Sequence, residues 1–275
     1  MTSIRLDQNA LILENSTKHN MLGYDQIENN LKRIAGQWYF SHRKGPTGVG
    51  KTLEDLLGIP ENNIPGPNGE MVEIKAIREG EESMITLFTK TPGGKNTIGI
   101  LLDRFGHTDK TRGKKVLHTT LSGDKYTDVT TEHGVFPLKI DFDYDDYGNI
   151  TLIQIVDYNH NTYAYWERAE LERTFRSKLG GSLILVLALS RKELNRECFC
   201  YHKALLLKGF SFDKFIDLIK NGKIKIDLRI GRYPNGRVHD HGTGFRISPN
   251  YIEHCFTSKK TIIDINCYGT GCIQT

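Results

Sequence analysis

Glu73 and Lys75 are the residues whose spacing could support phosphodiester chemistry. They stand two apart in the segment VEIKAIR, and residues at i and i+2 of a strand leave the same face. A carboxylate can hold Mg²⁺, and a nearby ammonium can orient an attacking water or stabilise the charge that develops on a phosphate. Because most Glu-x-Lys pairs on strands are simply solvated, this pair needs support from its surroundings.

Residues 45–52, GPTGVGKT, satisfy the pattern GxxxxGK[ST] of a nucleotide-binding loop, so a P-loop NTPase is one alternative function. Such a loop follows a buried parallel strand, whereas the preceding segment QWYFSHRK is short and basic. The apolar run LILVLALS also ends without the acid that would bind the metal of a nucleotide. Thr47, Lys51 and Thr52 could still approach a nucleic-acid phosphate, because Gly-rich backbone at the start of a helix attracts anions.

The segment KIKIDLRIG alternates apolar and polar residues, and after the turn PNG the segment RVHDHGTGFRI returns. Together they predict a long β-ribbon with one polar face. A two-stranded ribbon fits the major groove of DNA, where Arg bonds guanine and Asp accepts from cytosine, which favours a G·C-rich target. The polar face of the first strand carries Lys225, Asp227 and Arg229, and the returning strand carries Arg237, His239, Asp240, His241 and Arg246.

Two other interpretations of the histidines stay open. They could be the polar face of an exposed hairpin, or they could bind zinc, because His-x-His can chelate a metal. The zinc ligands would be His239, His241, His254 and Cys255, with Cys267 and Cys272 nearby, but their spacing is irregular.

The hydrophobic pattern predicts the elements that would position these groups. VEIKAIR and MITLFTK predict neighbouring strands across the polar turn EGEES, and SLILVLALS predicts a strand buried on both faces. PLKIDFDY and ITLIQIVDY predict a hairpin of a sheet with one solvated face. Helical spacing is found in MLGYDQIENNLKRIAG, TLEDLLG, WERAELERTFRSKL and FDKFIDLIKNG, so we expect a mixed α/β fold.

Composition excludes some classes of protein. The 275 residues include no apolar run near the roughly 20 residues that cross a bilayer, and the first twenty residues do not resemble a signal peptide, so we expect no membrane association and a cytoplasmic location. A net charge of +4 permits a polyanionic partner. The five cysteines form neither a disulfide framework nor paired CxxC motifs, which predicts reduced thiols.

The stretch from Gly45 to Arg78, followed by ITLFTKTP, resembles the MvaI/BcnI family of restriction endonucleases and, more distantly, the mismatch-repair nicking enzyme MutH, both of the PD-(D/E)xK superfamily. In those enzymes a helix glutamate precedes a strand-borne D-x(4)-E-x-K motif. The corresponding places here are held by Glu54, Asn68, Glu73 and Lys75. The resemblance covers about residues 28–250.

This resemblance implies a PD-(D/E)xK core of mixed α+β class, with a catalytic lobe at residues 1–165 and a DNA-recognition lobe at residues 166–275. It implies a type II enzyme that cuts double-stranded DNA at short CC-x-GG-like sites as a monomer, with a cognate DNA methyltransferase in the host. IDLRIG and HDHGTGFRI resemble the family's recognition region, so Asp227, Arg229, His239, Asp240, His241 and Arg246 inherit a base-reading role. Arg104 and His118 are weaker candidates for DNA contact.

The implied metal site has Glu73, residue 68 and the backbone carbonyl of Ile74 around Mg²⁺. Lys75 would position the attacking water, and Glu54 would support a second metal or water.

Asn68 departs from the family pattern, which has aspartate at this place. An amide oxygen can coordinate Mg²⁺ but brings no negative charge, so we expect weaker metal binding and weaker cleavage. An engineered substitution, a naturally inactive homologue and a replacement of the missing carboxylate by Glu70 are explanations that the sequence leaves open. A DNA-binding protein that does not cut is therefore the second alternative function.

Overall fold

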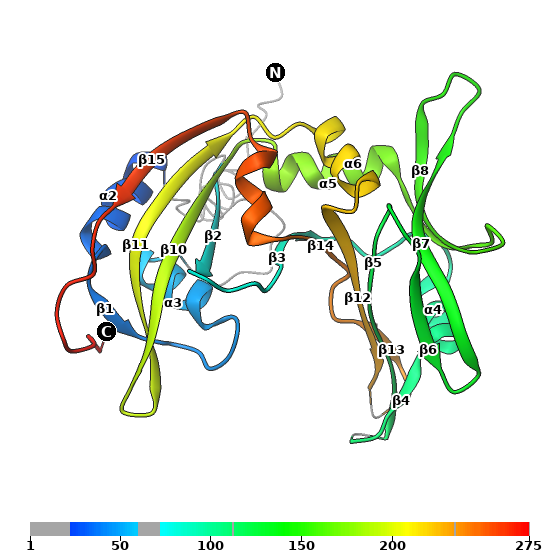
Figure 1. Cartoon of the computed structure of the whole chain (residues 1–275), viewed down its shortest axis with the longest axis horizontal. Coiled ribbons are helices and arrows are strands. Elements are labelled where there is room, and N and C mark those ends of the chain that lie inside the picture. The colour runs from blue at the N-terminus through cyan, green and yellow to red at the C-terminus, as the bar shows by residue number, and fades with distance from the viewer. Residues whose placement is uncertain (1–22, 60–71, 112, 234, 275) are drawn as a thin grey trace, which may run out of the picture.

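The computed structural model describes residues 23–59, 72–111, 113–233 and 235–274 (Figure 1). Within these ranges the chain forms three β-sheets, here called A, B and C, with helices packed between and beside them. This is the mixed α+β class that the hydrophobic pattern predicts. No helix in the described ranges is long and apolar enough to cross a membrane.

Sheet A has the strand order β1-β11-β10-β2, and β15 also pairs with β11. β10 runs parallel to β2 and antiparallel to β11, so it lies inside the sheet and its side chains are buried on both faces, as its apolar sequence predicts. The strands are β1 (Trp38–Phe40), β2 (Val72–Arg78), β10 (Ser182–Glu193), β11 (Arg196–Lys208) and β15 (Ser258–Asp264).

Two helices, α2 (Tyr24–Ile34) and α3 (Gly48–Leu57), cover one face of sheet A. The predicted helix at residues 21–36 is confirmed over its described part, but α3 begins four residues before the predicted TLEDLLG helix. A Cβ at Gly48 would lie 2.4 Å from the carbonyl oxygen of Arg43, so only glycine permits this close entry into α3. Much of the GPTGVGKT motif is therefore helix.

Sheet B corrects two expectations. Its order is β3-β14-β12-β5-β4, so β3 does not neighbour β2, which belongs to sheet A. β12 pairs with β13 and β14 as predicted, but it also pairs with β5, so the ribbon is built into a wider sheet and is not free-standing. The strands are β3 (Ile85–Thr89), β4 (His107–Asp109), β5 (Lys114–Leu121), β12 (Ile224–Arg232), β13 (Val238–Asp240) and β14 (Gly244–Ile247).

Sheet C is an antiparallel meander in the order β6-β7-β8-β9. The predicted hairpin is confirmed as β7 and β8, and its turn is held by Asp145, whose carboxylate accepts hydrogen bonds from the backbone N–H groups of Tyr147 and Asn149. The strands are β6 (Thr127–Thr131), β7 (Gly134–Tyr144), β8 (Ile150–Asp157) and β9 (Thr162–Glu167).

The largest hydrophobic core lies where the three sheets meet the remaining helices. The rings of Phe88, Phe175, Phe215 and Phe245, from β3, α5, α6 and β14, pack against one another there. The helices are α4 (Thr97–Phe105), α5 (Arg168–Leu179), α6 (Phe212–Lys220) and the 3-10 helix η1 (Pro249–Cys255). Sheets A and B each take strands from both sides of residue 165, so the expected lobe boundary does not coincide with a division between sheets.

The cysteines correct the expectation of reduced thiols. Cys198 is joined to Cys272 and Cys200 to Cys267 as disulfides, whereas Cys255 is free and buried. Both bonds tie the C-terminal segment to β11, and Ile273 also forms a bridge with Tyr39 on β1. Residue separations of 74 and 67 explain why spacing along the chain gave no hint of these pairs.

Candidate functional site

The predicted pair Glu73 and Lys75 comes together on β2. The Nζ of Lys75 lies 2.8 Å from Oε1 of Glu73, and both side chains leave the face of β2 opposite to Val72 and Ile74. Glu73 is almost completely buried, with its side chain 6% exposed, while that of Lys75 is 23% exposed. The two groups thus form an ion pair whose ammonium reaches solvent and whose carboxylate does not.

The second carboxylate oxygen of Glu73, Oε2, is buried and has no hydrogen-bond partner among the described residues. Removing an ionised carboxylate from water costs several kcal/mol unless a cation or hydrogen-bond donors replace the water. Lys75 satisfies one oxygen and leaves the other open to a second cation. Because carboxylate oxygen is the preferred ligand of Mg²⁺, the residues present fit a divalent metal ion.

The structure does not bring the other predicted members of the metal site into contact with Glu73 in the same way as Lys75. Glu54 lies partly buried on α3, whose apolar side chains pack with Val72 and Ile74, so α3 covers the face of β2 opposite to Glu73. Ile74 is buried and in register with Ile184 of β10. Asn68 and Glu70 lie outside the described residues. The role of Glu54 and of the Ile74 carbonyl stays a prediction.

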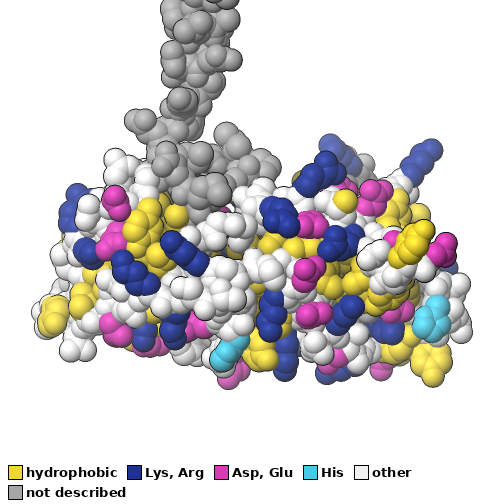
Figure 2. Space-filling model, turned by 90° about the horizontal axis from the view of Figure 1, so that it is seen from above, with side chains coloured by type: hydrophobic (Ala, Val, Ile, Leu, Met, Phe, Trp, Pro, Cys, Tyr) yellow, Lys and Arg dark blue, Asp and Glu magenta, His cyan; other side chains and the backbone are white. Residues whose placement is uncertain are grey.

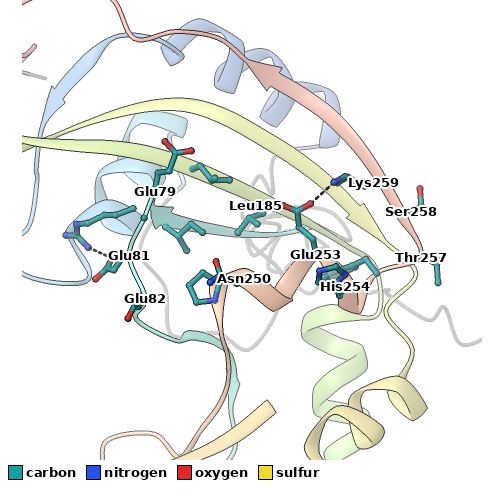
Figure 3. Close-up of a pocket in the computed structure, with 16 residues that line it drawn as sticks. Glu79, Glu81, Glu82, Leu185, Asn250, Glu253, His254, Thr257, Ser258 and Lys259 are labelled. Carbon is teal, nitrogen blue, oxygen red and sulfur yellow. Dashed lines mark hydrogen bonds and ion pairs between the residues drawn. The ribbon is translucent and has the colours of Figure 1, made fainter. Parts of the chain in front are cut away.

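A cavity of about 730 Å³ opens on the same side of sheet A, beyond Lys75 towards the end of β2 (Figure 3). Ile77, Leu185 and Leu187 form its floor, and neither Glu73 nor Lys75 lines it. Its rim is rich in carboxylates from the β2–β3 connection and from η1, namely Glu79, Glu81, Glu82 and Glu253. Arg78 and Lys259 also line the cavity and are ion-paired with Glu81 and Glu253, so its charge alone does not indicate a ligand.

The GPTGVGKT segment does not form a nucleotide-binding loop of the P-loop kind. The strand before it, β1, runs antiparallel to β11, whereas a P-loop follows a parallel strand. Arg78, at the end of β2, instead holds the segment: its Nη1 donates to the carbonyl of Pro46 at 3.0 Å and its Nη2 to that of Gly45 at 3.1 Å. The Nε of Arg78 also donates to Glu197 at 2.7 Å, which raises the pKa of the guanidinium.

Substitution of Arg78 by alanine should lower the free energy of unfolding by about 2–4 kcal/mol, because it removes the donor to the carbonyls of Gly45 and Pro46 and the ion-pair partner of Glu197. Urea denaturation measures this loss. Arg78→Lys is the matched control: it keeps the charge but not the forked geometry, so it should recover only part of the stability. Unchanged unfolding of Arg78→Ala would show that these contacts contribute nothing to folding.

Asp227 joins two of the predicted DNA-reading arginines on sheet B. Its Oδ2 accepts from Nε of Arg229 at 2.7 Å and from Nη1 of Arg246 at 2.8 Å, and its Oδ1 accepts from the hydroxyl of Thr120 at 2.9 Å. Asp227 is buried, whereas the Arg229 side chain is 55% exposed. The geometry therefore makes Asp227 a support for the two arginines rather than a group exposed to a base.

The predicted base-reading residues on β13 and just after it also differ in what they contact. Asp240 accepts hydrogen bonds from Thr91, Gly242 and Thr243, so its carboxylate is used to fix the connection between β13 and β14. The ring of His239 stacks on Tyr233, with centroids 4.2 Å apart, and meets the ring of His241 edge-on at 3.6 Å. His241 is exposed, which leaves it better placed than Asp240 to contact a ligand.

His118 and Arg104 lie on opposite sides of sheet B. His118 is the cross-strand partner of Arg229 and is exposed, so it belongs to the same polar face. Arg104 lies on α4, which packs against the apolar face, and its guanidinium sits over the ring of Tyr163. The structure thus brings His118, but not Arg104, to the face that carries Arg229.

The predicted zinc ligands do not assemble. Among the described residues, the group of three or more metal-ligating side chains with donor atoms within 4.8 Å consists of Glu193, Cys198 and Cys272, and includes no histidine. Charge offers no clearer guide to a binding surface, because the face seen in Figure 2 mixes Lys and Arg with Asp and Glu.

Comparison with known proteins identifies the chain. The model of the MvaI/BcnI restriction endonuclease family matches residues 28–256, which include β2, the polar face of sheet B and the strands that carry them. The chain belongs to the MvaI/BcnI restriction endonuclease family. It is a type II site-specific deoxyribonuclease, and enzymes of this kind generally use divalent metal ions.

Solved structures of MvaI agree with this assignment. The complex of restriction endonuclease MvaI with its cognate DNA is 30% identical, has a TM-score of 0.75, and matches over 87% of this chain and 98% of MvaI. MvaI in the absence of DNA is 28% identical and has a TM-score of 0.52, over 87% of this chain and 97% of that one. The described arrangement is therefore nearer to that of the DNA complex. No curated protein sequence matches.

Proposed function

We propose that this MvaI/BcnI family member cuts double-stranded DNA at a short CC-x-GG-like site, with Mg²⁺ held at Glu73. The observation that supports the proposal best is the buried carboxylate of Glu73, of which one oxygen pairs with Lys75 and the other has no partner among the described residues. This arrangement costs stability and is expected where a metal ion completes it.

We assign each residue of this site a role in the reaction. Glu73 would hold Mg²⁺ together with residue 68 and the backbone carbonyl of Ile74, and Glu54 would support a second metal or a water. When bound, the ion would stabilise negative charge on the phosphate and favour ionisation of a coordinated water. Lys75, whose ammonium reaches solvent, would orient the water for in-line attack on phosphorus.

Recognition would occur on the polar face of sheet B. Arg229 and His241 are exposed and would contact base edges, with His239 and Arg246 beside them, whereas Asp227 and Asp240 would fix the geometry. We propose that the enzyme acts as a cytoplasmic monomer and that a DNA methyltransferase protects the host.

Cleavage of plasmid DNA in Mg²⁺ tests the proposal, with the chain compared with its Asn68→Asp variant. A carboxylate at residue 68 restores the negative charge of the family motif, so Asn68→Asp should produce discrete fragments at least about 10-fold faster. Glu73→Ala in the same background should abolish them. Sequencing the fragment ends would give the site, and specific binding without nicking by either protein would favour a DNA-binding protein that does not cut.

A further inference from the structure

The hairpin that joins β10 to β11 carries a strained apolar residue at its tip. Glu193 and Arg196 are the last cross-strand partners, so Leu194 and Asn195 form a two-residue loop. Both loop residues have positive φ, 49° and 60°, as a type I′ turn requires. Asparagine and glycine adopt this conformation readily, whereas the Cβ of leucine makes it unfavourable. Glycine or asparagine at residue 194 would therefore suit the turn better than leucine does.

Leu194 also gains nothing from burial. Its side chain is 83% exposed, more than that of any other large aliphatic residue in the described part of the chain. A single exposed apolar side chain is ordinary on a protein surface, but one that is also conformationally strained is not, and strain of this kind concentrates at functional sites. Because leucine at this tip does not stabilise the free protein, it points to contact with another molecule.

The base of the hairpin is fixed by the C-terminal segment. Nη2 of Arg191 donates to the carbonyl of Thr270 at 2.6 Å, and Nη1 of Arg196 donates to the side-chain oxygen of Gln274 at 2.5 Å. Farther from the tip, a disulfide joins β11 to the same segment. The two strands therefore present the loop in a defined place, which lowers the entropic cost of binding to it.

Three exposed cations lie beside the tip. Lys192 and Arg196 flank the loop, one on each strand. Lys44 stands in the segment after β1, where the backbone N–H of Ser41 donates to the carbonyl of Glu197 on β11 at 2.7 Å. None of the three cations is ion-paired with a carboxylate of the described residues, and both carboxylates of the hairpin are paired with other arginines. Free cations suit phosphates, and an apolar side chain among them suits the minor groove of a duplex.

The hairpin continues the strand that borders the catalytic pair. Leu183 on β10 is the partner of Glu73, and β10 runs parallel to β2. Leu194 stands eleven residues farther along β10, which spans up to roughly 35 Å in an extended strand. Figure 1 shows the hairpin passing the end of β2 towards the same edge of the molecule to which β4 and β13 of sheet B extend. One turn of B-DNA has a similar length, so a duplex contact at the tip falls outside a short recognition site.

We propose that the β10–β11 hairpin is a second DNA contact, in which Leu194 packs into the minor groove while Lys44, Lys192 and Arg196 contact phosphates. This rests on the proposed function in that the chain binds duplex DNA, but it needs neither Mg²⁺ nor cleavage. Contacts of this kind carry little sequence information, so the hairpin adds affinity for any duplex, whereas the polar face of sheet B reads the bases.

Binding of the full chain to DNA without metal tests the proposal. The probe is a fluorescein-labelled duplex of arbitrary sequence, roughly 30 bp or three helical turns long, titrated in buffer with a chelator and followed by anisotropy. Leu194→Gly removes the side chain and relieves the strain, so it should leave the Tm unchanged or raise it. It should nevertheless weaken binding by roughly 10-fold, because the apolar contact is lost.

Asn195→Gly is the matched control: it changes the other residue of the same loop and keeps Leu194, so the Kd should stay that of the unaltered chain. Lys192→Ala should lower the slope of log K against log salt by about one, the value for one phosphate contact. An unchanged Kd for Leu194→Gly would overturn the hairpin contact. So would a dimer of the unaltered chain that Leu194→Gly abolishes while the Kd stays the same. DNA binding without cleavage would count against the nuclease proposal alone.

Discussion

The Glu73→Gln variant should cut DNA on the order of 10³-fold more slowly. The comparison is made in whichever background cuts faster, the chain with Asn68 or its Asn68→Asp variant. The substitution keeps the size of the side chain but removes the negative charge that we propose holds Mg²⁺. Binding to the recognition site without metal should change little, because Glu73 is buried and does not lie on the polar face of sheet B. Plasmid nicking measures the rate, and a gel-shift titration measures the Kd.

Stability gives this prediction a second readout. Glu73→Gln should not lower the free energy of unfolding, since it replaces a buried charge that has an unpartnered oxygen. Lys75→Met should lower it by about 2 kcal/mol, because the carboxylate then stays buried without its ion-pair partner. Glu79→Gln, in the nearby cavity, is the control and should affect neither property. Unimpaired cleavage by Glu73→Gln would contradict a metal-binding role for Glu73.

Asp227→Asn should weaken binding to the specific site by roughly 30-fold, while binding to unrelated duplexes changes much less. Asp227 fixes both Arg229 and Arg246, and without its charge neither guanidinium is held in the orientation that base contacts need. Competition binding with a specific duplex and with duplexes altered at one base pair measures the loss. Arg229→Ala should relax discrimination at one base pair, at a cost of about 1–3 kcal/mol.

Lys225→Ala is the matched control for Asp227→Asn. Lys225 lies on the same strand and face, but it is not hydrogen-bonded to Asp227, so its loss should reduce specific and nonspecific binding alike. The same uniform loss in Asp227→Asn would show that the Asp227 cluster contributes charge only. Comparison of the Tm values of the variants would show whether the fold itself has changed.

Local pattern predicted the elements well where burial follows chain periodicity. β12 buries Ile224, Ile226, Leu228 and Ile230, as strict alternation predicts, and β10 is buried on both faces, as its unbroken apolar sequence predicts. Sequence pattern did not predict which strands pair with each other. VEIKAIR and MITLFTK are both strands, yet a short turn between them says nothing about which sheet each joins, and they separate into sheets A and B.

Sequence pattern does not reveal residues that act by positioning other residues. Arg78 received no role, because its acceptors lie more than thirty residues away along the chain in the Gly45–Pro46 turn and at Glu197. The polar face of its strand predicts a base contact for Asp227, but its burial and its two arginine partners depend on the packing of β5, β12 and β14.

The sequence by itself determined the class of fold, the order of most elements, the Glu73–Lys75 pair and the family to which the chain belongs, because periodicity and motif spacing are properties of neighbouring residues. Only the tertiary structure decided the burial of the second Glu73 oxygen, the hydrogen bonds of Asp227 to two arginines and the pairing of four cysteines in two disulfides. These features join residues that are distant in the chain, and what sets them is the packing of sheets against each other, which no local pattern records.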